Sequence, residues 1–166
     1  MNEDVLQRAR GVRLAIFDVD GVMTDGTLYF GPRGEAMKAF HIQDGNGLKL
    51  LQKAGVATAI LSGRTSTAVA KRAKELTIAH VIQGTGDDKV PEFEKLLKKL
   101  KLRDEQCSFM GDDIQDLAVL KRVGLAAAPS NAVDAVKSAV HIVMKAHGGR
   151  GAIREFCDLV VQARRK

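Results

Sequence analysis

Short, continuous apolar runs alternate along this chain with segments that have helical patterning. The runs predicted to be buried strands are 12–19, 56–62, 80–84, 107–113 and 125–130. A helix precedes them, and the further predicted helices are 45–55, 66–77, 90–102, 114–124, 131–139 and 152–165. Strands that are apolar throughout and are separated by helices are typical of a parallel sheet covered on both faces. The alternation therefore predicts an α/β fold with a central, mainly parallel sheet.

One segment departs from this alternation. The runs "TLYF" and "EAMKAFHI" flank "GPRG", in which glycine and proline are typical of a tight turn. This pattern predicts a β-hairpin over 27–42 that projects from the main fold. Its apolar content favours burial in an interface over a solvated flap; the residues concerned are Leu28, Tyr29, Phe30, Met37 and Phe40.

Length and cysteine content limit the class of protein. The 166 residues fit one domain, 1–166, with a core of its own. No apolar stretch reaches about 18 residues, and the N-terminal segment lacks the apolar centre of a signal peptide. Cys107 and Cys157 lie far apart without metal-type spacing, which favours reduced thiols and a cytoplasmic location.

The net charge of +6 raises the question of a nucleic-acid partner. Aromatic residues make up only 4% of the chain and tryptophan is absent, so platforms for base stacking are scarce. The basic residues are also spread at the spacing of helix surfaces. The charge is therefore better interpreted as a mild attraction for an anionic small substrate, with neither nucleic acid nor membrane as a partner.

Side chains suited to chemistry lie at the ends of the predicted strands or just after them. The end of the first strand gives Asp18 and Asp20, that of the second 62–64 (Ser-Gly-Arg) and that of the fourth 111–113 (Gly-Asp-Asp), while the third leads to Lys89. Each alone is commonly a cap, a turn or a surface residue. Together they meet at the carboxyl edge of a parallel sheet, where ligands bind. Converging carboxylates indicate a hard cation such as Mg²⁺, and the hydroxyl and the lysine are then available for phosphate oxygens.

In order along the chain, "DVDGVMTDG", "LSGR", Lys89 and "GDDIQD" resemble the four motifs of the haloacid dehalogenase superfamily of phosphotransferases. More narrowly, "FDVDGVMTDGTLYF", "FHIQDGNGLKLL", "LSGR" and "GGRGAIREFCDLV" resemble the 3-deoxy-D-manno-octulosonate 8-phosphate phosphatase family. This second resemblance covers nearly the whole chain from about Val12. It implies a Rossmann-like three-layer sandwich and Mg²⁺-dependent hydrolysis of that sugar phosphate in lipopolysaccharide precursor synthesis.

The resemblance also implies roles for the acidic residues. Asp18 matches the nucleophile that forms an aspartyl-phosphate, and Asp20 matches the general acid and base. Mg²⁺ is expected on the Asp18 carboxylate, the Asp20 backbone carbonyl and Asp112. Asp113 and Asp116 are expected to support these ligands without binding the ion themselves.

Substrate contacts are implied by the same resemblance. Ser62, Gly63 and Lys89 match the phosphate-binding residues, and Arg64 matches an arginine that contacts the anionic end of the sugar. Arg150 lies among glycines in "AHGGRGAIREF" and is expected to form part of a mobile lid over the substrate.

The chain leaves no room for a cap domain after the hairpin or between the second and third motifs. The resemblance therefore implies a capless domain and a homotetramer, in which hairpins spanning 26–41 associate and neighbouring subunits shield each site. Phosphatases of related sugar acid phosphates, such as sialate 9-phosphate, and a non-catalytic phospho-ligand-binding protein of the same fold stay open as alternatives. A phospho-receiver domain is disfavoured, because its phosphorylated aspartate would stand at the position of Ser62.

Overall fold

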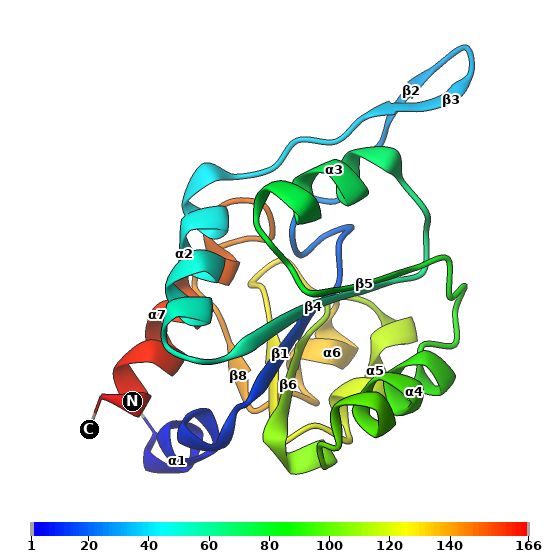
Figure 1. The fold of residues 1–166 in the computed structure, drawn as a ribbon. Helices are drawn as coiled ribbons and strands as arrows, with labels where there is room; N and C mark the ends of the chain where they lie inside the picture. Colours follow the sequence, from blue (N-terminus) through cyan, green and yellow to red (C-terminus); the bar gives the residue numbers. More distant parts are fainter. Residues whose placement is uncertain (1, 166) are drawn as a thin grey trace.

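The computed structural model describes residues 2–165 and centres on a six-stranded sheet (Figure 1). Its strand order is β5-β4-β1-β6-β7-β8, and every neighbouring pair is parallel. The strands are β1 (Leu14–Phe17), β4 (Ala57–Ser62), β5 (His80–Gln83), β6 (Cys107–Met110), β7 (Leu125–Ala128) and β8 (Ile142–Val143). The sheet therefore places β1 near its middle, between β4 and β6.

Helices cover both faces of this sheet. One face packs against α1 (Glu3–Gly11), α2 (Ile42–Lys53), α3 (Thr67–Glu75) and α7 (Ala152–Arg164). The other packs against α4 (Val90–Leu100), α5 (Leu117–Leu120) and α6 (Asp134–Lys137). Strand β1 alternates between the two cores, since Phe17 belongs to the first and Ile16 to the second. The predicted three-layer α/β sandwich is confirmed.

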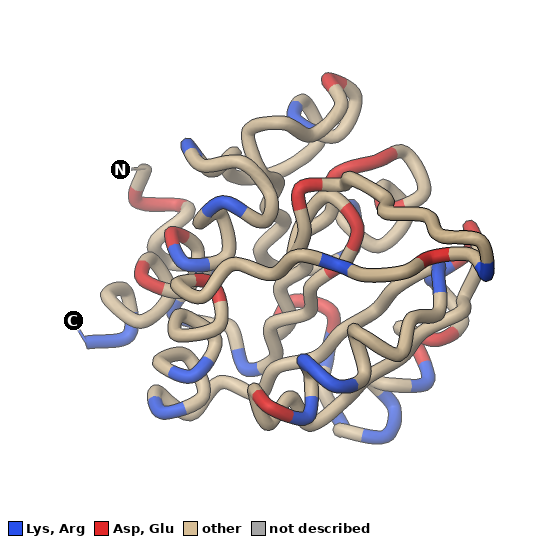
Figure 2. Tube along the Cα trace, turned by 90° about the horizontal axis from the view of Figure 1, so that it is seen from above, with Lys and Arg blue, Asp and Glu red and all other residues tan. Residues whose placement is uncertain are grey.

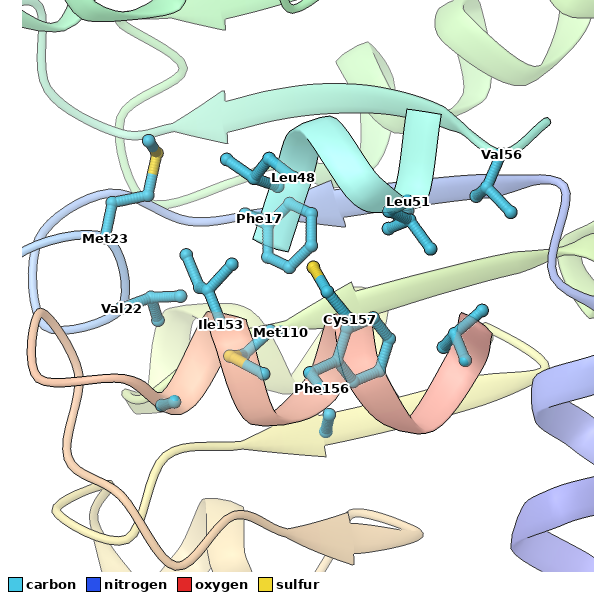
Figure 3. Packing of buried hydrophobic residues seen from close by; sticks show 14 of the residues in the cluster. Phe17, Val22, Met23, Leu48, Leu51, Val56, Met110, Ile153, Phe156 and Cys157 are labelled. Carbon is cyan, nitrogen blue, oxygen red and sulfur yellow. The ribbon is translucent and has the colours of Figure 1, made fainter. Parts of the chain in front are cut away.

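Aromatic packing fixes the end of β1 against α7. The ring of Phe17 meets the ring of Phe156 edge to face, with centroids 5.8 Å apart and an interplanar angle of 86°. Leu48 of α2 and Ile153 of α7 pack in the same cluster (Figure 3). Each such buried side chain contributes roughly 1.5–3 kcal/mol to stability. This packing holds rigid the strand that ends directly before Asp18.

The hairpin predicted from the turn sequence projects from the sandwich (Figure 1). It consists of the antiparallel strands β2 (Tyr29–Gly31) and β3 (Gly34–Met37). Gly34 has a φ of +102°, a backbone conformation that favours glycine and closes the turn. Phe30 and Met37 are 66% and 60% exposed, so the hairpin presents apolar side chains to its surroundings.

Two predicted helices differ from the structure, and one strand was not predicted. The predicted helix 114–124 consists of a 3₁₀ turn, η2 (Ile114–Asp116), and the four-residue α5, because the Asp116 side chain bonds back to its own loop. The predicted helix 131–139 is only α6, and β8 within "HIVMK" was not predicted as a strand. The remaining 3₁₀ turn is η1 (Asp104–Gln106).

Charge is distributed over the whole fold. In Figure 2 the Lys and Arg positions are interleaved with Asp and Glu positions along many elements.

Among residues 2–165, none of the helices is both long and apolar enough to cross a membrane. Cys107 and Cys157 are free cysteines, and both are buried.

Candidate active site

The carboxyl ends of β4, β1 and β6 lie side by side and bring the predicted residues together. The backbone N–H of Asp18 donates to the carbonyl of Met110 at 3.0 Å, so the β1–β6 ladder continues up to this aspartate. A cavity of about 160 Å³ opens at this edge. Its lining residues come from four strand ends or the loops after them: Asp18, Asp20, Ser62, Gly63, Arg64, Gly86, Asp87 and Gln115.

Lys89 is buried beneath this edge, at the start of α4. Its ammonium lies 2.9 Å from Asp18 Oδ1 and 2.6 Å from Asp116 Oδ1, and 5.6 Å from the centroid of the Phe109 ring. Burial lowers the pKa of Lys89, but the two carboxylates outweigh it and the net pKa is raised. The lysine therefore stays charged and holds two of the acids in place.

Asp116 shapes the loop that presents Asp112. It is fully buried, and its Oδ2 accepts the backbone N–H groups of Asp112 at 2.9 Å and Asp113 at 3.2 Å. A Cβ on Gly111 would lie 2.6 Å from the Asp116 side chain, so only glycine leaves room for Asp116 to reach these backbone N–H groups. Asp113 is exposed and accepts the N–H of Ile114 as a cap. Of the two predicted supports, Asp116 therefore bonds the loop directly and Asp113 caps the turn.

Two carboxyls of the site have strongly raised pKa values. Burial raises the pKa of Asp18 from 3.8 to about 6, opposed by Lys89 and reinforced by Asp116. Burial, followed by the charges of Asp18, Asp116 and Asp113, raises the pKa of Asp112 from 3.8 to about 8. Ionised acids at this edge therefore repel one another, and one lysine only partly compensates them.

These acids fit a hard divalent cation. One oxygen from each of Asp18, Asp112 and Asp116 lies within 4.8 Å of the others. Both oxygens of Asp116 already accept hydrogen bonds, which leaves Asp18 and Asp112 to face an ion. Next to them, Gly21 has a φ of +83°, and a Cβ there would lie 2.0 Å from Asp112 Oδ2. An all-oxygen donor set of few carboxylates suits Mg²⁺.

Asp20 belongs to a second charged cluster that the sequence did not predict. Its Oδ1 is paired with the Lys38 ammonium, and Arg64 Nε lies 3.6 Å from its Oδ2. Glu35 bonds both cations, at 3.1 Å from Lys38 and 2.9 Å from Arg64. The sequence does not predict that Glu35 and Lys38 meet at the same cluster, because residues 35 and 38 of one continuous strand would point to opposite faces of it. Strand β3 ends at Met37, and Lys38 turns back to the site.

Ser62 and Gly63 lie where the second strand end meets the loop after β5. Ser62 is buried, and its backbone carbonyl accepts the Thr85 hydroxyl at 3.4 Å. A Cβ on Gly63 would lie 2.7 Å from the carbonyl oxygen of Gly86. Glycine at this position thus allows the two loops to close one wall of the cavity.

Arg150 lies apart from the cavity-lining residues. Its guanidinium is 3.1 Å from Asp25, and its side chain is 68% exposed. A Cβ on Gly148 would lie 1.8 Å from the carbonyl oxygen of Gly21, and one on Gly149 would lie 2.5 Å from Asp25 N. These two glycines permit close packing against the loop after β1. The structure does not bring Arg150 together with the phosphate-binding residues, and its role in a lid stays a prediction.

Comparison with known proteins gives a consistent result. A family model described as haloacid dehalogenase-like hydrolase matches residues 81–155. The 3-deoxy-D-manno-octulosonate 8-phosphate phosphatase KdsC of Yersinia pestis is 42% identical over 164 residues, which are 99% of this chain and 87% of the relative. The crystal structure of the Yersinia pestis phosphatase has a TM-score of 0.96 and covers 100% of this chain and 89% of that chain.

A further solved structure contains ligands. The Moraxella catarrhalis 3-deoxy-D-manno-octulosonate 8-phosphate phosphatase, solved with a magnesium ion, a phosphate ion and a KDO molecule, is 36% identical with a TM-score of 0.96. It covers 99% of this chain and 94% of that chain. The sandwich and its strand-end acids thus define a phosphatase of the haloacid dehalogenase-like hydrolases. Within that class, the chain belongs to the 3-deoxy-D-manno-octulosonate 8-phosphate phosphatase family.

Proposed function

We propose that this protein hydrolyses 3-deoxy-D-manno-octulosonate 8-phosphate to the free sugar acid and phosphate, as a step in lipopolysaccharide precursor synthesis. The observation that carries the proposal is the likeness to phosphatases of that name over the full chain. The placement of Asp18 at the rim of a cavity beside Asp20, Ser62 and Arg64 supports it.

In the first half of the reaction, a carboxylate oxygen of Asp18 attacks the phosphorus and the bond to the sugar oxygen breaks. Asp20 gives its proton to that leaving oxygen, and the phosphoryl group stays on Asp18 as an aspartyl-phosphate. In the second half, water attacks the phosphorus and gives its proton to Asp20. The bond between phosphorus and the Asp18 oxygen breaks, phosphate leaves, and both carboxyl groups return to their starting states.

The other site residues bind charge. Lys89 fixes Asp18 at 2.9 Å, and its ammonium would donate a hydrogen bond to a phosphoryl oxygen held at Asp18, while Ser62 and Gly63 line the cavity. Asp18 and Asp112 would hold Mg²⁺, with the backbone carbonyl of Asp20 as a further ligand. When bound, the ion supplies positive charge that offsets the negative charge of the phosphoryl group and of the acids.

A phosphate-release assay tests this function. With Mg²⁺ present, kcat/KM for 3-deoxy-D-manno-octulosonate 8-phosphate is expected to exceed that for simple hexose phosphates by about a hundredfold, since a site built for a polar group rejects ligands that lack it. A higher value for sialate 9-phosphate would transfer the assignment to that substrate. Equal values for the octulosonate and the hexose phosphates would contradict the proposed specificity.

Arg64 is proposed to contact the anionic end of the sugar, because its side chain lines the cavity and is 46% exposed. Arg64→Ala is expected to lower kcat/KM for the sugar acid phosphate about tenfold to a hundredfold, the value of a charged hydrogen bond. An aryl phosphate without a carboxylate should lose less than about threefold. The matched control is Arg103→Ala, at an exposed arginine beside η1. An equal loss on both substrates would assign Arg64 to the phosphoryl group or the fold.

We further propose a single capless domain, 1–166, located in the cytoplasm and assembled as a homotetramer. Along the chain, α3 and β5 are the only elements between Ser62 and Lys89, and the hairpin is the only element between the first motif and α2. Neither insertion is long enough to form a cap domain over the cavity. A neighbouring subunit seated on the exposed apolar hairpin would cover it.

If the hairpin forms the tetramer interface, a charge placed on it should lower the mass of the assembly in solution. Phe30→Glu is expected to shift the protein from tetramer to smaller species, because it places a charge where an apolar side chain that is 66% exposed would be buried. Light scattering after size exclusion measures this. Ile114→Glu is the control, since Ile114 is 65% exposed but lies outside the hairpin. A tetramer that survives Phe30→Glu, or a wild-type monomer, would rule out this interface.

A further inference from the structure

Four alternating charges connect the base of the hairpin to the catalytic edge. Asp20 and Arg64 come from the ends of β1 and β4, while Glu35 and Lys38 come from β3 and the residue after it. Each carboxylate contacts both cations and each cation contacts both carboxylates. The hairpin is therefore not only a projection toward solvent, because its charged residues complete the surroundings of Asp20.

The two oxygens of Asp20 are held differently. Oδ1 is hydrogen-bonded to the Lys38 ammonium. Oδ2 faces Arg64 Nε at 3.6 Å, which is within ion-pair range but too long for a hydrogen bond. Lys38 thus fixes one oxygen of the carboxyl group, and the other is left available for proton transfer.

The cations also differ in burial. The Lys38 side chain is 2% exposed, whereas that of Arg64 is 46% exposed. Arg64 can turn toward a substrate in the cavity, but Lys38 is enclosed by the cluster. Without Lys38, Asp20 and Glu35 would lose the buried ammonium that they share, and only the half-exposed Arg64 would be left to offset their mutual repulsion. The expected result is a displaced Asp20 carboxyl group.

We propose that Lys38 is a positioning residue for Asp20: it fixes Oδ1, and so directs Oδ2 to the sugar oxygen that leaves phosphorus. Glu35 assists by holding Lys38 from the hairpin side. The inference rests on the proposed function, in which Asp20 is the proton donor. It adds that the hairpin takes part in catalysis within its own subunit. A displacement of Asp20 by about 1 Å is enough to lower the rate a hundredfold.

The test compares two leaving groups. A sugar alkoxide needs a proton to leave, whereas p-nitrophenolate leaves readily without one. Lys38→Met keeps most of the apolar stem and removes the ammonium. It is expected to lower kcat/KM for the sugar acid phosphate about tenfold to a hundredfold, and that for p-nitrophenyl phosphate less than about threefold. Since partial unfolding lowers both values equally, the ratio of the two is independent of the folded fraction.

Two reference variants separate the possible outcomes. Asp20→Asn should change the ratio in the same direction and by more, and Lys49→Met, at an exposed lysine on α2, should leave it unchanged. If Asp20→Asn leaves the ratio at the wild-type value, the proposed role of Asp20 fails. If Asp20→Asn changes the ratio and Lys38→Met does not, the role of Lys38 alone is overturned. Lys38→Gln, which keeps a donor and should shift the ratio less, replaces Lys38→Met if that variant is too inactive to measure.

Discussion

Asp18→Asn is expected to abolish turnover, with a loss of at least about a thousandfold in kcat, while the fold stays intact. An amide cannot attack phosphorus to form an acyl-phosphate, so the first covalent step has no nucleophile. The shape of the side chain is retained, and Lys89 keeps its 2.6 Å contact with Asp116. Because burial raises the pKa of Asp18 to about 6, a neutral amide at this position is not expected to destabilise the protein.

The measurement is steady-state phosphate release together with a melting temperature. Asp134→Asn is the matched control, since the Asp134 side chain is 97% exposed on α6 and pairs only with Lys137 among the described residues. A folded Asp18→Asn protein that keeps more than a trace of the wild-type rate would exclude Asp18 as the nucleophile. Trapping of a phosphorylated wild-type enzyme that the variant does not form would support the assignment directly.

The meeting of the strand ends was predictable because it depends on strands, and strands have strong local signals. Buried apolar runs precede Asp18 and Asp112, and Ser62 ends another such run. Once the alternation with helices implies a parallel sheet, their ends must share one edge. The convergence of these side chains follows from that edge, whatever the exact bounds of each strand.

The charged cluster around Asp20 was not predictable in the same way. It depends on how far β3 extends, and a strand continued through Lys38 would have turned this side chain to the other face. The pairing of Arg150 with Asp25 likewise depends on the packing of two glycine-containing loops. Such contacts arise from tertiary geometry and leave no periodic pattern in the sequence.

Removal of metal is expected to remove activity. Treatment with EDTA should lower turnover by about a hundredfold or more, and excess Mg²⁺ should restore it, because the ion offsets charge that Lys89 alone cannot balance. Asp112→Ala should weaken Mg²⁺ binding, since Asp112 and Asp18 are the acids of the cluster whose oxygens are not all engaged by residues 2–165. Calorimetric titration with Mg²⁺ measures this loss independently of turnover.

Stability should respond to pH and to Mg²⁺ together. In the metal-free protein the pKa of Asp112 rises from 3.8 to about 8 and that of Asp18 to about 6. Both groups then bind protons more tightly in the folded chain, so their contribution favours folding in acid and is lost as pH rises through these values. Mg²⁺ competes with those protons and should raise the melting temperature more at about pH 8 than at about pH 5.

Asp112→Ala should abolish most of that Mg²⁺-dependent increase, whereas Asp134→Ala on α6 should leave it unchanged. Removing Asp112 should also make the metal-free protein less sensitive to alkaline pH, because one of the two acids that disfavour folding there is gone. The metal site would be contradicted by full activity in excess EDTA. It would equally be contradicted by a wild-type melting temperature that does not respond to Mg²⁺ at about pH 8, where the repulsion among the ionised acids is greatest.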